Sequence, residues 1–156
     1  MKGLLVGLVL ALSGPAALAQ TTPPPYGPPI RLEAAQALVD RAIAVARAGK
    51  FRMAIAVVEP SGELVAFARM DDTQYGSILV AQRKAATAAR YRGATADMEQ
   101  KVLAGRTVTL ANEDSLPIAD GLPIIVDGRI VGALGVSGAA ASEDDAVARK
   151  ALEPGR

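Results

Sequence analysis

Apolar positions recur at helical spacing in several segments of the chain. In the first segment, Leu38, Val39 and Ala42 fall on one helical face, and Gly49 follows as a stop signal. The last segment opens with a capping box in which Ser142 precedes a run of acidic residues. The helices predicted from these patterns cover residues 32–48, 76–91, 95–104 and 142–152.

Other apolar stretches are too short for core helices and are typical of antiparallel hairpins. In the first, Pro60 and Gly62 occupy the second and fourth positions of a tetrapeptide that suits a type I turn. In the second, Asp127-Gly128 separates two apolar runs, which is a strong signal for a two-residue turn. The expected strands are 53–58 and 63–70, the two arms of 122–136, and a brief strand at 107–110.

Hairpins join their strands in antiparallel order, whereas a doubly wound parallel sheet requires long crossover connections. The order of elements therefore predicts an α+β fold in which two hairpins form an antiparallel sheet. Helices flank this sheet, so the expected arrangement is layered like that of profilin.

The two ends of the chain are expected to lie outside this fold. Lys2, an apolar run and an Ala17-Leu18-Ala19 site have the form of a secretory signal peptide at 1–19. A membrane anchor that is not removed is the alternative, and no later segment is apolar enough to span a membrane. A proline-rich leader at 20–30 is expected to be an extended spacer before a domain at 31–153. The chain is thus predicted to be periplasmic or secreted.

Composition excludes several kinds of chemistry. The chain has no cysteine and no histidine, so thiol catalysis, thiolate metal sites and imidazole bases are absent. The acidic pairs do not match a calcium loop, and no metal site is predicted. Without residues 1–19 the 17 basic residues fall to 16, which balance the 16 acidic ones and argue against a nucleic-acid partner.

Glycines inside the last expected strand indicate a need for space. Gly132 and Gly135 cost stability there, so another backbone, a bulge or a ligand is expected close by. Ser137 follows, and with no histidine only Lys84 could serve as its base. The favoured interpretation is that Ser137 bonds locally to the backbone, and no catalytic residue is assigned.

Arg69 and Lys84 are the charged residues of most interest. Arg69 ends an expected strand, and Lys84 lies in the middle of an alanine-rich helix. One interpretation is structural: Arg69 pairs with Asp71 or Asp72, and Lys84 extends to solvent. The other is that both bind an anion, in a pocket between the Lys84 helix and the strand with the glycines.

Several motifs together resemble the GlcG/HbpS-like family. They are Arg69-Met70-Asp71, Lys84-Ala85, Gly121-Leu122-Pro123-Ile124 and the glycine-rich run at 132–138. The resemblance implies an antiparallel sheet flanked by helices, assembly into homo-oligomers, and haem or another tetrapyrrole as ligand. Because the chain has no histidine, an axial ligand would have to be Met70, Tyr75, Tyr91 or a lysine.

Two functions remain open at this point. The first is an exported haem- or tetrapyrrole-binding protein with a sensing or sequestration role and without catalysis. The second is a module or enzyme that binds small carboxylates, such as hydroxy acids, through Arg69 and Lys84. The expected ligand-binding residues for both are Arg69, Met70, Tyr75, Lys84, Gly132, Gly135 and Ser137.

Overall fold

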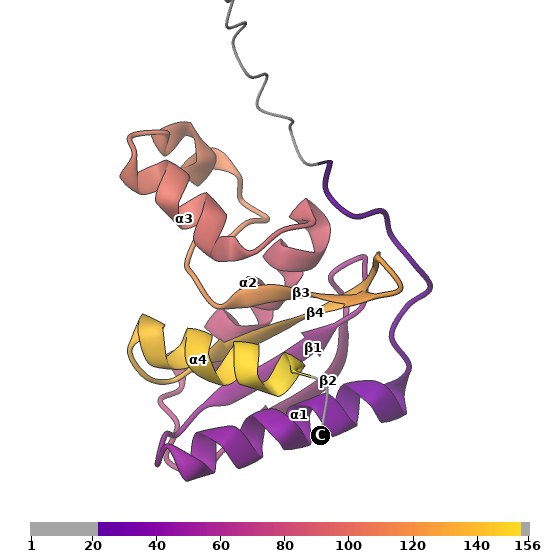
Figure 1. Cartoon of the computed structure of the whole chain (residues 1–156). Helices are drawn as coiled ribbons and strands as arrows, with labels where there is room; N and C mark the ends of the chain where they lie inside the picture. The colour runs from indigo at the N-terminus through magenta and orange to yellow at the C-terminus, as the bar shows by residue number, and fades with distance from the viewer. Residues whose placement is uncertain (1–21, 154–156) are drawn as a thin grey trace, which may run out of the picture.

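The computed structural model describes residues 22–153, so the expected signal peptide lies outside the described residues (Figure 1). A four-stranded sheet in the order β2-β1-β4-β3 forms its centre, and every pairing within it is antiparallel. The elements are α1 (Leu32–Ala48), β1 (Ala54–Val58), β2 (Leu64–Arg69), α2 (Gly76–Tyr91), α3 (Thr95–Leu103), the 3₁₀-helix η1 (Thr107–Ala111), β3 (Gly121–Val126), β4 (Arg129–Ser137) and α4 (Ala141–Leu152). The predicted α+β class and its two hairpins are confirmed.

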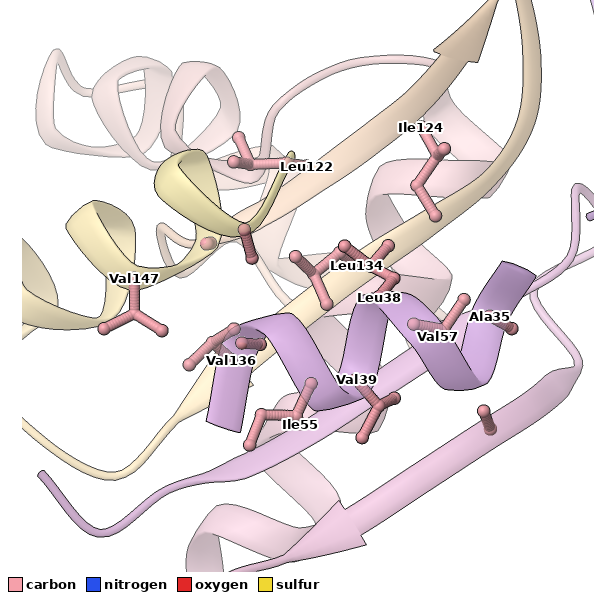
Figure 2. Close-up of a cluster of buried hydrophobic side chains, with 14 of the residues drawn as sticks. Ala35, Leu38, Val39, Ile55, Val57, Leu122, Ile124, Leu134, Val136 and Val147 are labelled. Atoms are coloured by element: carbon pink, nitrogen blue, oxygen red, sulfur yellow. The ribbon is translucent and has the colours of Figure 1, made fainter. Parts of the chain in front are cut away.

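The two faces of the sheet are covered by different kinds of core. Side chains alternate along β1, so that Ile55 and Val57 face α1 and α4, while Ala54 and Ala56 face α2. Figure 2 shows the first face, where the branched residues of the sheet meet Leu38 of α1. The second face is almost entirely alanine, which brings the α2 backbone close to the sheet.

Glycine on β4 makes this close approach possible. A Cβ atom on Gly135 would collide with the carbonyl oxygen of Ala81 and lie 2.7 Å from the amide nitrogen of Ala85. A Cβ on Gly132 would collide with the carbonyl oxygen of Val58. Of the three reasons that the sequence left open, close backbone approach therefore applies at both positions, and Gly132 also adjoins a register shift in the β3–β4 pairing.

The proline-rich leader is part of the domain from Pro25 onward and is not a free spacer. It runs beside the half of β4 that β1 does not reach (Figure 1). Ile130 donates its N–H to the Pro25 carbonyl (2.9 Å), and Gly27 donates to the Ile130 carbonyl (2.8 Å). The Tyr26 hydroxyl lies 3.0 Å from the carbonyl oxygen of Ala89, at the last turn of α2. These bonds satisfy backbone groups of β4 and of the α2 terminus that would otherwise lack partners.

Two local predictions were wrong. The brief strand expected at 107–110 is instead the 3₁₀-helix η1, because no neighbouring strand pairs with it and β-propensity alone does not make a strand. The last helix begins at Ala141 and not after a Ser142 cap: Glu143 reaches back and accepts the N–H of Ala140 (3.0 Å). Among residues 22–153, no helix combines the length and apolar character needed to cross a membrane.

Candidate functional site

The loop between β2 and α2 borders two neighbouring hollows, which we call the 69–75 cleft. The first has a volume of about 380 Å³ and the second about 580 Å³, and both are open to solvent. Arg69, Asp71 and Asp72 line both hollows. The first is completed by Ile43, Arg47, Arg52 and Met70, and the second by Thr73, Gln74 and Tyr75.

Three guanidinium groups and the carboxylates of Asp71 and Asp72 are the charged groups of this cleft. The three arginines of the cleft come from different elements: Arg47 from α1, Arg52 from the loop before β1, and Arg69 from the end of β2. Among the described residues, only Arg52 of these three has a carboxylate within 4 Å of its guanidinium. That partner is Asp72, at 4.0 Å, in an exposed and therefore weak pair. The pairing of Arg69 with Asp71 or Asp72 expected from the sequence is not formed, so its guanidinium remains available to an anion.

Tyr75 and Thr73 are the residues of the larger hollow that carry hydroxyl groups. The Tyr75 side chain is 80 % exposed, and the guanidinium carbon of Arg69 lies 5.3 Å from the centre of its ring. Thr73 is only 4 % exposed, yet its Oγ1 atom has no hydrogen-bond partner among the described residues. A buried hydroxyl without a partner is costly, so the wall of this hollow is polar but not satisfied by the chain itself.

Lys84 lies elsewhere, in the interior between α2, β4 and α4. Its ammonium is 2.9 Å from Asp120 Oδ2, 3.1 Å from the Val136 carbonyl oxygen and 3.5 Å from Asp144 Oδ2. All three charged side chains are at least nine-tenths buried. The expectation that Lys84 extends to solvent is therefore wrong, because two buried carboxylates hold its charge inside the fold.

No sequence pattern marks Asp120, and Asp144 belongs to the acidic run that is expected only to open the last helix. Asp144 also accepts the backbone N–H of Ala139 (2.9 Å), which ties the loop after β4 to α4. Asp120 adopts a positive φ of 86°, and a Cβ on the next residue, Gly121, would collide with the Lys84 carbonyl oxygen. Gly121, directly after Asp120, was the one sequence signal for this close approach, because the absence of a side chain at Gly121 lets this part of the chain pass close to the α2 backbone.

The pH dependence of stability should report on Asp120. Burial raises the pKa of Asp120, and its hydrogen bond from Lys84 opposes part of this rise. A carboxyl group whose pKa is higher in the folded than in the unfolded protein adds to the free energy of unfolding below about pH 4, where it is protonated in both states. This contribution is lost as the pH rises through the pKa of the folded protein. Denaturation of wild type and Asp120→Asn across pH should show the variant gaining stability relative to wild type as pH rises.

The exposed Asp40 on α1 offers a matched control. Asp40→Asn removes the same charge without entering the buried cluster, so it should not produce this trend. A wild-type-to-variant difference for Asp120→Asn that is constant between pH 4 and 7 would contradict the assignment.

The remaining residues predicted to bind ligand lie on β4 and do not line the 69–75 cleft. Gly132 and Gly135 contact protein backbone, and the 6 % exposed Ser137 directs its hydroxyl to Ser77 Oγ on α2 (3.2 Å) and not to the local backbone. Lys84 makes no hydrogen bond to Ser137, so no nucleophile and base pair forms there. The helix that carries Lys84 is α2, and it packs directly against β4. This packing fills the space where a pocket was expected.

The structure thus brings Arg69, Met70 and Tyr75 to one cleft and separates them from Lys84, Gly132, Gly135 and Ser137. The 69–75 cleft offers cations, a phenol and a thioether on an open surface. Such a set can bind a carboxylate-bearing ligand and can offer an oxygen or sulfur ligand to a metal-containing group.

Comparisons with known proteins agree with this fold. The chain is 38 % identical to protein GlcG of Escherichia coli over 92 residues. This match covers 59 % of the chain and 69 % of GlcG. Its structure matches a double mutant of Streptomyces reticuli HbpS with a TM-score of 0.73 and 27 % identity, covering 95 % of this chain and 96 % of that one. It also matches PduOC, whose crystal structure is a haem complex, with a TM-score of 0.72 and 24 % identity over 80 % of this chain and 93 % of PduOC.

The model of one family matches residues 30–153, which is nearly the whole of the described domain. The same residues contain both hairpins and the helices that cover them. The chain therefore belongs to the HbpS-like family, whose description is "haem degrading protein HbpS-like".

Proposed function

We propose that this protein binds haem or a related tetrapyrrole at the 69–75 cleft. The observation that carries the proposal is the gathering of three arginines, a methionine and an exposed tyrosine around one loop. The family description and the haem complex of PduOC support the choice of ligand.

The residues of the cleft fit the chemical groups of haem. The propionates are carboxylates, and Arg47, Arg52 and Arg69 can each bind one through paired N–H donors. Tyr75 and Met70 are known types of axial ligand, and the buried Thr73 hydroxyl still lacks a partner in the wall. When bound, haem supplies an iron that accepts an axial ligand and can change its oxidation state.

The open shape of the cleft sets an expectation for affinity. Its lining is mostly polar, with Ile43, Met70 and Tyr75 as the larger apolar surfaces. Haem affinity arises largely from burial of the porphyrin, and a single copy of the domain offers little apolar area for this. Arginine contacts to the propionates should therefore contribute a large share of the binding free energy.

Titration with haemin tests the proposal. A Soret band should grow and saturate, and Arg69→Ala should weaken binding by about 1–3 kcal/mol because a hydrogen bond to a charged group is lost. Arg106→Ala removes an exposed arginine outside the cleft lining and should bind haemin normally. The absence of a saturable Soret band would overturn the proposal.

The same arginines support a second candidate, a module that binds small carboxylates such as hydroxy acids. Arg47 and Arg69 have no carboxylate within 4 Å among residues 22–153, which favours capture of an external anion. Lys84 does not belong to this site, because its ammonium forms buried ion pairs with Asp120 and Asp144. Calorimetric binding of glycolate that depends on Arg69, together with no haemin binding, would favour this function.

We further propose that residues 1–19 are removed, that the protein acts in the periplasm or outside the cell in haem sensing or sequestration, and that it forms a homo-oligomer. Exposed apolar residues on α2, α3 and η1 support self-association, among them Leu79, Leu103 and Val108. Native mass spectrometry of protein from an exporting host should give multiples of a chain that begins at Gln20. A monomer that retains Met1 would contradict both expectations.

A further inference from the structure

The side chains available to ligate iron can be compared one by one. The chain has three tyrosines and neither histidine nor cysteine. The Tyr26 hydroxyl is used by the carbonyl oxygens of Ala89 and Arg90, and the Tyr91 hydroxyl donates to Asp114 Oδ1 (2.8 Å). Tyr75 alone makes no hydrogen bond through its hydroxyl to a described residue, and it is by far the most exposed of the three.

The methionines of the domain are less suitable. Met53 is fully buried beneath α1, and Met98 lies on α3 outside the cleft. Met70 does reach the cleft, but it lines the smaller hollow and packs in part against the hydrophobic core. Its thioether would have to leave that packing to meet an iron atom, whereas the Tyr75 ring already lies on the surface.

The chemical type of the axial ligand distinguishes the oxidation states of iron. Tyr75 would present a phenol oxygen, and the guanidinium carbon of Arg69 lies 5.3 Å from the centre of its ring. A phenolate is a hard, anionic ligand and favours ferric over ferrous iron, whereas a thioether favours the reduced state.

From these contacts we propose that Tyr75 is the iron ligand and that the cleft is therefore selective for ferric haem. This inference rests on the haem-binding function proposed above. It commits to one of the candidate ligands, and Arg69, which packs against the Tyr75 ring, acts as a positioning residue in addition to binding a propionate.

Three porphyrin probes separate iron ligation from simple stacking on the tyrosine ring. Ferric haemin, haem reduced with dithionite, and metal-free protoporphyrin IX should each be titrated into wild type, Tyr75→Phe and Met70→Leu. Phenylalanine keeps the ring and removes only the oxygen. Tyr75→Phe should lower ferric haemin affinity by at least about tenfold, because even the loss of an outer-sphere partner costs about 10–100-fold. Its affinity for metal-free protoporphyrin should not change.

The spectrum of the ferric complex gives a second readout. Wild type and Met70→Leu should show the high-spin spectrum and phenolate-to-iron charge-transfer band of a tyrosinate complex, and Tyr75→Phe should lack both. Wild type should bind ferric haemin more tightly than the reduced form. Tyr91→Phe is the matched control, because it removes a hydroxyl that Asp114 already engages.

Arg69 is tested by rescue. Arg69→Gln should weaken ferric haemin binding because the propionate loses its cation, and it should shift the charge-transfer band because the Tyr75 ring loses its neighbour. Arg69→Lys should restore much of the affinity because it retains the positive charge. If haemin binds but Tyr75→Phe changes neither its affinity nor its spectrum, the ligand assignment is wrong and the binding function stands. If no probe binds to wild type, the proposed function itself fails.

Discussion

Replacing Lys84 with methionine is expected to lower the free energy of unfolding by about 3–5 kcal/mol, the usual cost of leaving a buried charge without its partner. Methionine fills a similar volume but leaves Asp120 and Asp144 facing each other without a cation. It also removes the donor to the Val136 carbonyl, which lies on the central strand β4. Urea denaturation of the two proteins at neutral pH measures the difference directly.

Two further variants identify the cause of this loss. Lys101→Met on the exposed surface of α3 should change stability little, because that ammonium has no buried carboxylate beside it. Adding Asp120→Asn to Lys84→Met should recover part of the loss, since it removes one of the uncompensated charges. If Lys84→Met unfolds like wild type but no longer binds haemin, Lys84 is a binding residue and the buried-cluster interpretation is wrong.

The helices and hairpins could be predicted because their signals are local. The helices at Leu32–Ala48 and Gly76–Tyr91 have the same bounds as predicted, since apolar spacing and nearby glycines mark both. The turn at Asp127-Gly128 has positive φ at both residues, as the two-residue hairpin requires. The gathering of Arg69, Met70 and Tyr75 was also accessible, because all three lie within one loop and its flanking residues.

The pairing within the buried cluster could not be predicted, because Gly121 marks only a close backbone approach and the charged partners are distant in the sequence. Lys84 lies 36 residues from Asp120 and 60 from Asp144, and neither aspartate is marked by a periodic pattern. A lysine on an alanine-rich helix is most simply interpreted as solvent-exposed, so the prediction failed where tertiary contacts reverse that preference. The packing of the leader on the domain was not predicted for a related reason. The Tyr26 hydroxyl bonds to the carbonyl of Ala89 in α2, 63 residues later in the sequence, whereas proline content alone indicates only extended backbone.

Gly135→Ala should be the second most damaging change, because the α2 backbone leaves no space for a methyl group. The added Cβ would collide with the Ala81 carbonyl oxygen and meet the Ala85 amide nitrogen, and neither atom can rotate away as a side chain could. Overpacking of a core costs about 1–3 kcal/mol, and we expect a loss at the upper end of that range because a whole helix must shift.

Gly76→Ala is the matched control for this prediction. Gly76 is the first residue of α2, no atom lies within 4 Å of the Cβ position apart from its chain neighbours and the backbone of its own helical turn, and its φ is not in the left-handed region. Alanine there should be neutral or should stabilise by about 0.4–1 kcal/mol through the unfolded chain. Thermal denaturation of both variants would test the comparison. If Gly135→Ala has the same melting temperature as wild type, α2 can move away from β4 without loss of stability. A ligand pocket between α2 and β4 would then again be possible.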